Sequence, residues 1–306
     1  MVEVSLLGTG GMLPLQNRYL TAMALRYKGK VILVDCGEGT QVALRNTTFG
    51  YKKIDYICFT HFHADHVTGL PGLLLTIGNS DRVEPIYIIG PRGIGEIVRN
   101  ITVVSRDIPF NLEFIEVGNE DFSLPIFENE LVINCKNMHH GKNIQCLGYR
   151  FDIKRVGKFN VDKAKQNNVP QEIWGKLQKN DEVIFESVIY RKEQVLDKER
   201  KGISVSYCTD TRPFDEMAEF VYNSDLFICE GLYGDDEKFE IAKKHNHMIF
   251  REACEVALNG EVKELWLTHY SPAFTEPLKY DDFIKSIFPK AYIGEDGKSI
   301  SIQFEE

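Results

Sequence analysis

The sequence predicts a mixed α/β (α+β) protein in which two mixed β-sheets pack face to face with helices outside. Short apolar runs bounded by turn residues occur in both halves of the 306-residue chain, as expected of strands. Segments with helical periodicity lie between these runs. Because no linker rich in proline, glycine or serine divides the chain, we expect residues 1–306 to form a single domain.

The first half of the chain alternates predicted strands with predicted helices. Its opening strands are separated by tight turns such as GTGGMLP and KGK. Helices are expected after the Gly-Glu-Gly turn and after the apolar strands IDYICFT and EPIYIIGP. The predicted strands cover residues 4–8, 21–27, 31–37, 54–60 and 84–91, and the predicted helices cover 39–47, 67–78 and 93–100.

The second half returns to strands and contains one long helical region. The segment KFEIAKKHNHMIFREACEVALNG is amphipathic and is expected to be helical over residues 238–260. The last predicted strand is VKELWLTH. The predicted strands of this half cover residues 112–117, 131–138, 146–153, 183–190, 203–210, 226–231 and 262–269.

The composition excludes several classes of protein. No apolar stretch approaches the roughly 18 to 20 residues that span a bilayer, and the N-terminus lacks a basic signal-peptide region, so we expect no membrane association. Seven cysteines occur without a CxxC motif and mostly in apolar runs, which favours free thiols in a reducing cytoplasm over a disulfide framework. The net charge of -9 argues against binding nucleic acid through general positive charge.

One segment has the opposite charge. Residues 154–179 hold seven lysines and arginines against Asp162 and Glu172. A solvated helical hairpin would account for this pattern, and so would an anion-binding arm on an acidic body. The polar, lysine-rich region at about 154–202 is predicted to project from the body as an insertion.

The eight histidines fall in four short groups, which scattered structural histidines would not do. In the group THFHADH, His61 and His63 lie at the end of a predicted strand. Because side chains along a strand point alternately to its two faces, these two histidines are expected to point to the same side. Asp65 and His66 follow at the turn into a helix. Because zinc takes imidazole and carboxylate ligands, this group predicts two ligands for each of two ions.

Other strand ends supply the remaining ligands. Asp210 ends one strand, and its two oxygens can bridge two ions; His269 ends the last strand. In MHHG we favour His140 as the ligand, with His139 as the alternative. Together these residues supply the ligands that two tetrahedral or five-coordinate zinc ions need, which predicts a two-zinc hydrolase.

His247 is a candidate proton donor. The pattern places it in the first turns of the long helix, where a surface histidine would also be ordinary. In a site that already holds its metals, a spare imidazole with a pKa near neutrality can protonate a leaving group. Glu230, at the end of the strand LFICEG, is a candidate for orienting that imidazole.

These motifs resemble the metallo-β-lactamase superfamily, and within it the ribonuclease Z family, whose members remove 3′ trailers from precursor tRNA. The resemblance covers nearly the whole chain. It rests on GTGGMLP with Arg18 after it, and on DCGEGTQ, THFHADHVTGLPGLL, CLGYR, CTDTRP, KHNHM and LTHYSP.

The resemblance implies a four-layer αββα sandwich, usually present as a homodimer whose second subunit holds the tRNA. It implies that Asp65 orients the nucleophile and that His247 is the general acid. It also implies one zinc ion on His61, His63 and His140, a second on Asp65, His66 and His269, and Asp210 as the bridge between them.

The expected function is therefore zinc-dependent endonucleolytic cleavage of precursor tRNA, leaving a 3′-hydroxyl on the tRNA and a 5′-phosphate on the trailer. One alternative is a two-zinc hydrolase of the same fold acting on a small phosphodiester, lactone or thioester. The tip of the arm favours this alternative, because Pro170-Gln171-Glu172 stands where the family usually has a Pro-Pro-Gly-Pro-like turn. A catalytically inactive RNA-binding or scaffold protein is disfavoured, because no expected ligand is missing.

Overall fold

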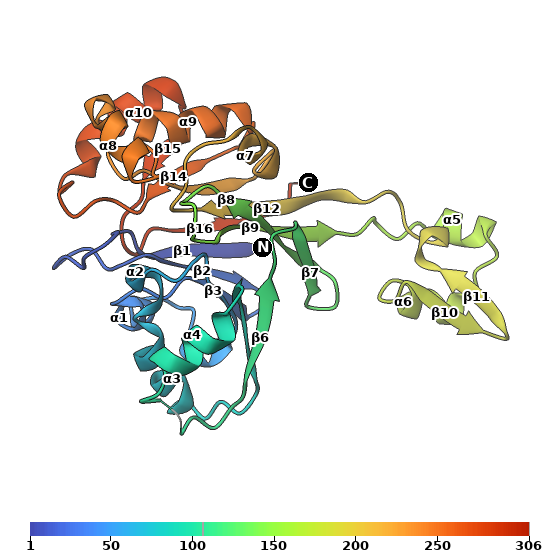
Figure 1. Cartoon of the computed structure of the whole chain (residues 1–306). Helices are drawn as coiled ribbons and strands as arrows, with labels where there is room; N and C mark the ends of the chain where they lie inside the picture. Colours follow the sequence, from blue (N-terminus) through green and yellow to red (C-terminus); the bar gives the residue numbers. More distant parts are fainter. Residues whose placement is uncertain (106, 306) are drawn as a thin grey trace.

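Four layers make up the body of the molecule, with helices outside two β-sheets that pack against each other (Figure 1). The computed structural model describes residues 1–105 and 107–305. This arrangement confirms the predicted pair of mixed sheets with outer helices. Within the described residues, none of the helices is long and apolar enough to cross a membrane.

The first sheet has the strand order β16-β1-β2-β3-β4-β5-β6. Its strands β3 to β6 are parallel, whereas β16, β1, β2 and β3 are antiparallel neighbours. The strands are β1 (Val2–Gly8), β2 (Ala22–Tyr27), β3 (Lys30–Val34), β4 (Ile54–Cys58), β5 (Ile86–Pro91), β6 (Leu112–Val117) and β16 (Ser299–Ile302).

The second sheet repeats this plan with the order β15-β14-β13-β12-β9-β8-β7. Strands β12 to β15 are parallel and the other pairs are antiparallel. Strand β13 is buried throughout, as expected of a parallel strand covered on both faces. The strands are β7 (Phe122–Ile126), β8 (Leu131–Met138), β9 (Cys146–Arg155), β12 (Arg200–Cys208), β13 (Leu226–Glu230), β14 (Leu265–Thr268) and β15 (Ala291–Ile293).

Helices cover the outer face of each sheet, and apolar clusters fill the spaces between layers. The cluster between the two sheets includes Leu25, Tyr149 and Trp266, all nearly or fully buried. The first sheet is covered by α1 (Thr40–Arg45), α2 (Ala64–Val67), α3 (Leu70–Gly78) and α4 (Ile94–Ile101). The second is covered by α7 (Asp215–Phe220), α8 (Phe239–Lys244), α9 (Phe250–Asn259) and α10 (Asp281–Ile287).

Three predictions of secondary structure were wrong. The helix expected over 238–260 is interrupted, because Asn246 adopts a left-handed conformation with φ 61° between α8 and α9. The strand expected over 183–190 is a hairpin that turns at Glu186 and Ser187, which also have positive φ. The helix expected over 67–78 begins only at Leu70, after a short separate α2. Strands β7, β15 and β16 were not predicted.

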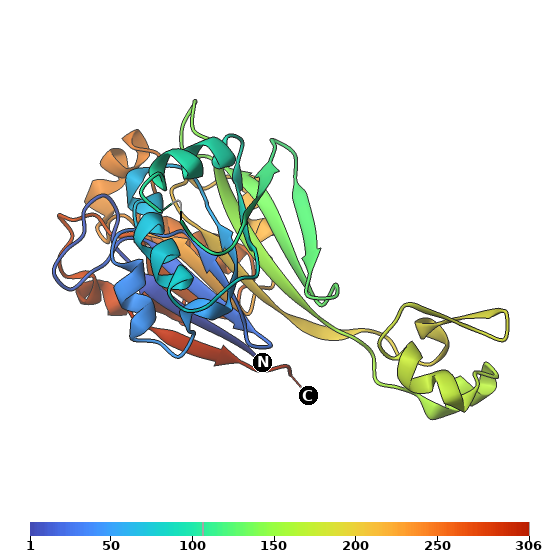
Figure 2. The same ribbon diagram turned by 90° about the horizontal axis from the view of Figure 1, so that it is seen from below.

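An arm projects from the body beyond the ends of β9 and β12 (Figures 1 and 2). It contains its own apolar cluster, in which Ala164, Ile173 and Leu177 are buried and Trp174 packs against them. The side chain of Asn160 caps the first helix of the arm by accepting from Lys163 N–H. Its elements are α5 (Val161–Gln166), α6 (Trp174–Leu177), β10 (Glu182–Phe185) and β11 (Val188–Arg191).

Candidate metal centre

Five imidazoles and two carboxylates converge at one edge of the sandwich, just beyond the ends of several strands. His140 and Asp210 each lie two residues past a strand, and His269 directly follows β14. His61 and His63 lie in the loop after β4, which ends at Cys58, so their proximity is set by that loop and not by strand periodicity. The residues brought together are His61, His63, Asp65, His66, His140, Asp210 and His269.

The first group of donors surrounds Oδ2 of Asp210. This oxygen lies 3.6 Å from Nε2 of His61 and 3.7 Å from Nε2 of His140. Nε2 of His140 lies 3.3 Å from Nδ1 of His63. Three imidazoles and one carboxylate oxygen therefore face a common point.

The second group of donors surrounds the other oxygen of the same carboxylate. Oδ1 of Asp210 lies 3.3 Å from Nε2 of His66 and 3.2 Å from Nε2 of His269. Oδ2 of Asp65 lies 3.7 Å from the former nitrogen and 3.4 Å from the latter. Asp210 thus directs one oxygen to each group, as a bridging carboxylate would.

These distances fit a metal ion in each group. Donors about 2.0 to 2.1 Å from a tetrahedral zinc are separated by roughly 3.3 Å, which is close to the spacings in both groups. Nε2 of His61 is buried and has no hydrogen-bond partner among the described residues. Nε2 of His66 and Nε2 of His269 face each other at 3.3 Å. A cation held between buried nitrogens that converge in this way would satisfy them.

The electrostatics of the cluster also favour a cation. Nearby imidazoles hold the pKa of Asp210 well below its usual range, although burial opposes this. The pKa of Asp65 is likewise lowered against the effect of burial, mainly by its contact with His269. Burial lowers the pKa of His66, but the carboxylates of Asp210 and Asp35 outweigh it and raise the pKa well above the ordinary value. The carboxylates of Asp65 and Asp210 are therefore ionised, and a metal ion can neutralise their negative charge.

Asp35 supports both groups and was not predicted from the sequence. Its Oδ2 accepts from Nδ1 of His66 at 2.9 Å, and its carboxylate accepts from the hydroxyl of Thr60 at 3.0 Å. That hydroxyl lies 3.1 Å from Nδ1 of His61. The signal in the sequence that could have indicated this role is an aspartate directly after the apolar run VILV, which ends β3.

The backbone at the centre adopts sparsely populated conformations. Asp35, Asp210 and His269 have φ of 58°, 53° and 58°, in the left-handed region that non-glycine residues rarely occupy. Gly11 packs so closely on the ring of His269 that an added Cβ would lie 2.7 Å from Cε1. Such strain persists only where surrounding contacts enforce it, and it is typical of functional sites.

His247 lies next to the cluster, in the loop between α8 and α9 and not in a helix as the sequence predicted. Its ring centroid is 5.2 Å from that of His140 and 5.5 Å from that of His269. Nδ1 of His247 donates to Oε2 of Glu230 at 2.9 Å. Burial lowers the pKa of His247, but the charge and hydrogen bond of Glu230 outweigh it and raise the pKa to about 9.

The neighbour of His140 points elsewhere. His139 is exposed, and its ring stacks on Phe214 with centroids 4.1 Å apart. His139 belongs to none of the donor groups found in the described residues, so the geometry favours His140 over His139 as the ligand.

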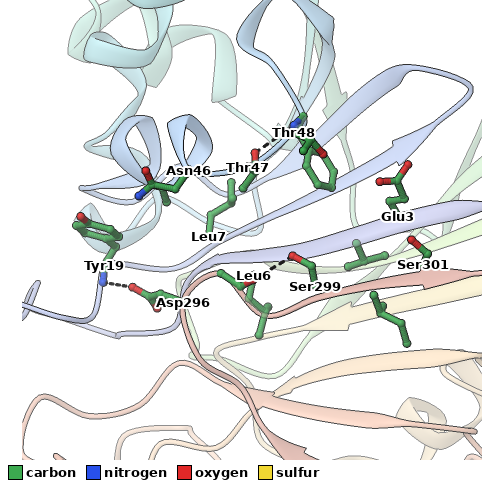
Figure 3. A pocket seen from close by; sticks show the side chains of 15 residues that line it. Glu3, Leu6, Leu7, Tyr19, Asn46, Thr47, Thr48, Asp296, Ser299 and Ser301 are labelled. Atoms are coloured by element: carbon green, nitrogen blue, oxygen red, sulfur yellow. Dashed lines mark hydrogen bonds between the residues drawn. The ribbon is translucent and has the colours of Figure 1, made fainter.

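A separate cavity of about 500 Å³ lies between β1, β16 and the segment after α1 (Figure 3). Asp296, one of the residues that line this cavity, accepts from Tyr19 N–H, and Ser299 and Ser301 also line it. Among the described residues, none of the metal-centre side chains lines it. The candidate metal centre and this cavity are therefore separate features of the molecule.

Comparisons with known proteins find relatives that cover the whole chain. A protein named ribonuclease Z from Clostridium acetobutylicum is 49% identical over 309 residues, which cover 100% of this chain and 99% of that protein. Another ribonuclease Z, from Lachnoclostridium phytofermentans, is 47% identical over 306 residues, with 100% and 99% covered. A family model described as anti-Pycsar protein Apyc1 matches residues 2–99 alone.

Solved structures share the fold. Human tRNase Z, short form, has a TM-score of 0.70 and 24% identity, covering 99% of this chain and 100% of that one. Zn²⁺-bound PqqB from Methylobacterium extorquens has a TM-score of 0.65 and 12% identity, covering 98% and 100%. With relatives 47% and 49% identical over the full chain, the chain belongs to the ribonuclease Z family of metal-dependent hydrolases with the metallo-β-lactamase fold.

Proposed function

We propose that this protein is a zinc-dependent endoribonuclease that removes the 3′ trailer of precursor tRNA by phosphodiester hydrolysis. The observation that carries the proposal is the bridging position of Asp210 between two donor groups, with His247 beside them. The relatives named ribonuclease Z support the choice of substrate. They do not favour the alternative of a small phosphodiester, lactone or thioester.

We propose His61, His63 and His140 as ligands of one zinc ion, Asp65, His66 and His269 as ligands of a second, and Asp210 as the bridge. When bound, two such ions would lower the pKa of a water molecule to about 7 and would neutralise charge on the phosphoryl oxygens. Among the described residues the contacts of Asp65 are made by Oδ2, one of them with Met12 N–H at 2.7 Å. Oδ1 can therefore accept a hydrogen bond from the attacking water and orient it.

His247 is the proposed general acid. Because Nδ1 donates to Glu230, the second proton of the imidazolium resides on Nε2. The raised pKa keeps this proton in place at neutral pH. Attack of water on the phosphorus would break its bond to the 3′ oxygen of the tRNA, and this proton would let that oxygen leave as a hydroxyl and not as an alkoxide. The products are a 3′-hydroxyl on the tRNA and a 5′-phosphate on the trailer.

The arm is proposed to bind the RNA backbone. Its exposed lysines include Lys158, Lys165, Lys176 and Lys179, which lie on an otherwise acidic protein.

We also propose a homodimer. Light scattering tests this, because a homodimer would have twice the chain mass of 35.1 kDa. We also propose a cytoplasmic location, because the described part of the chain holds seven buried free thiols, which persist in a reducing compartment.

End-labelled precursor tRNA tests the function. We expect a single cut near the discriminator base, with a trailer that becomes a substrate for 5′-phosphate-dependent exonuclease. An Asp210→Ala variant serves as the inactive control for contaminating nuclease. Hydrolysis of a chromogenic phosphodiester without cleavage of any precursor tRNA would refute the proposed substrate and revive the small-substrate alternative.

A further inference from the structure

The loop that carries His247 is held at its backbone as well as at its imidazole. Glu230 fixes the ring, and the N–H of His247 donates to the carbonyl of Ala242 at 2.9 Å. The carbonyl of His247 accepts from Nη1 of Arg212 at 2.6 Å. The position of the imidazole therefore depends on a side chain outside the loop.

Arg212 acts together with Glu252. The guanidinium makes a two-pronged ion pair with the Glu252 carboxylate, one prong being 2.8 Å from Nη1 to Oε2. The same carboxylate accepts from Ile249 N–H at 3.1 Å, at the start of α9. The pair thus holds the chain on both sides of Met248. The two side chains are only 18% and 10% exposed, so the pair is shielded from solvent and geometrically defined.

The backbone of Arg212 connects this loop to the metal centre. Its N–H donates to the carbonyl of His139 at 3.0 Å, one residue from the candidate ligand His140. Arg212 itself follows the bridging carboxylate Asp210 by two residues. One residue therefore links the segments that carry His140, Asp210 and His247.

We propose that Arg212, supported by Glu252, is a positioning residue that sets the distance and direction of His247 relative to the two donor groups. This inference rests on the proposed function, in which His247 protonates the leaving oxygen. General acids lose effectiveness steeply when misplaced, and a displacement of about 1 Å can cost about 100-fold in rate. The loss should appear only where the leaving group needs a proton.

Two substrates whose leaving groups differ in their need for a proton test the positioning role of Arg212. The 3′ oxygen of tRNA is a strongly basic leaving group, whereas the nitrophenolate of bis(p-nitrophenyl) phosphate departs without protonation. We expect Arg212→Lys and Glu252→Gln to lower kcat for precursor tRNA roughly 10- to 100-fold, with KM and metal content little changed. Hydrolysis of the nitrophenyl ester should fall far less. Arg251→Lys is the matched control, because Arg251 makes an exposed ion pair with Asp236 and should behave as wild type on both substrates.

A double-mutant cycle separates positioning from a general structural role. If Arg212 acts through His247, Arg212→Lys should cause no further loss in a His247→Ala background. Equal loss on both substrates, or an undiminished loss in that background, would overturn the positioning role. His247→Ala alone reports on the proposed function: if it slows both substrates equally, the general-acid role is what fails. Selective loss in His247→Ala without one in Arg212→Lys refutes the positioning role only.

Discussion

Oδ2 of Asp35 lies 2.9 Å from Nδ1 of His66, on the side of the ring opposite the metal centre. This contact holds a proton on Nδ1, so Nε2 is the nitrogen that would face a metal ion. We expect Asp35→Asn to lower metal affinity about 10- to 100-fold, because the amide cannot accept from both His66 and Thr60 in the same way. Competition with a chromogenic chelator measures this.

The control for this substitution is Asp81→Asn, since Asp81 is exposed and its φ of 56° is tolerated by asparagine. Asp81→Asn should bind metal with the affinity of the wild type. If the metal affinity of Asp35→Asn is also within about twofold of the wild type, Asp35 does not support the metal ligands.

Gly11 provides a steric test of the position of His269. A Cβ at residue 11 would lie 2.7 Å from Cε1 of this imidazole, so Gly11→Ala must displace the ring or the loop. We expect metal content to fall and precursor cleavage to drop at least about tenfold, as for loss of an oriented ligand. Gly175→Ala is the control, because a Cβ there meets no atom within 4 Å. Normal metal content in Gly11→Ala would contradict the described geometry.

The pH dependence of cleavage should have an alkaline limb set by His247. A general acid works in its protonated form, so activity is present below its pKa and is lost as the pH rises through about 9. Bound cations lower this pKa, which makes about 9 an upper bound. In Glu230→Gln the charge that raises the pKa is gone, so the limb should move to lower pH. An unmoved limb, recorded as kcat for precursor tRNA, would show that the titrating group is not this pair.

The charge of the arm should affect RNA and small substrates differently. Lys165→Glu with Lys176→Glu should weaken tRNA binding and reduce its salt dependence, with each phosphate contact contributing about one unit to the slope of log affinity against log salt. These lysines are exposed, whereas Lys163 donates to the carbonyl of Leu196 and belongs to the structure of the arm. Lys52→Glu with Lys53→Glu changes the net charge equally on the body and serves as control. Equal weakening by both double variants would indicate a general charge effect.

Much of the fold could be predicted because local chemistry decides it. Apolar runs such as LFICE form buried strands, and chemically active residues follow them, so His140, Asp210 and His269 could be placed at strand ends. The helix over 238–260 was wrong because its periodicity continues through Asn246, whose left-handed backbone breaks it. Strand β15 is only three residues long, and β16 alternates serine and isoleucine at a sheet edge, so neither gave a clear signal.

The candidate site was less predictable where it depends on contacts across the fold. The pairing of Glu230 with His247 was proposed from their places in the chain, and the structure places them 2.9 Å apart. The roles of Asp35 and Arg212 depend instead on side chains that are distant in the chain, which no local pattern encodes. His66 is 31 residues from Asp35, and Glu252 is 40 residues from Arg212.

Metal analysis of the purified protein tests most directly whether the two donor groups hold two metal ions. After loading with zinc and gel filtration, the wild type should hold about two ions per chain. Asp210→Ala removes the carboxylate that faces both donor groups, so it should retain less than one. A wild type that binds no metal, or an Asp210→Ala variant that keeps both ions at full affinity, would contradict a centre of two metal ions bridged by Asp210.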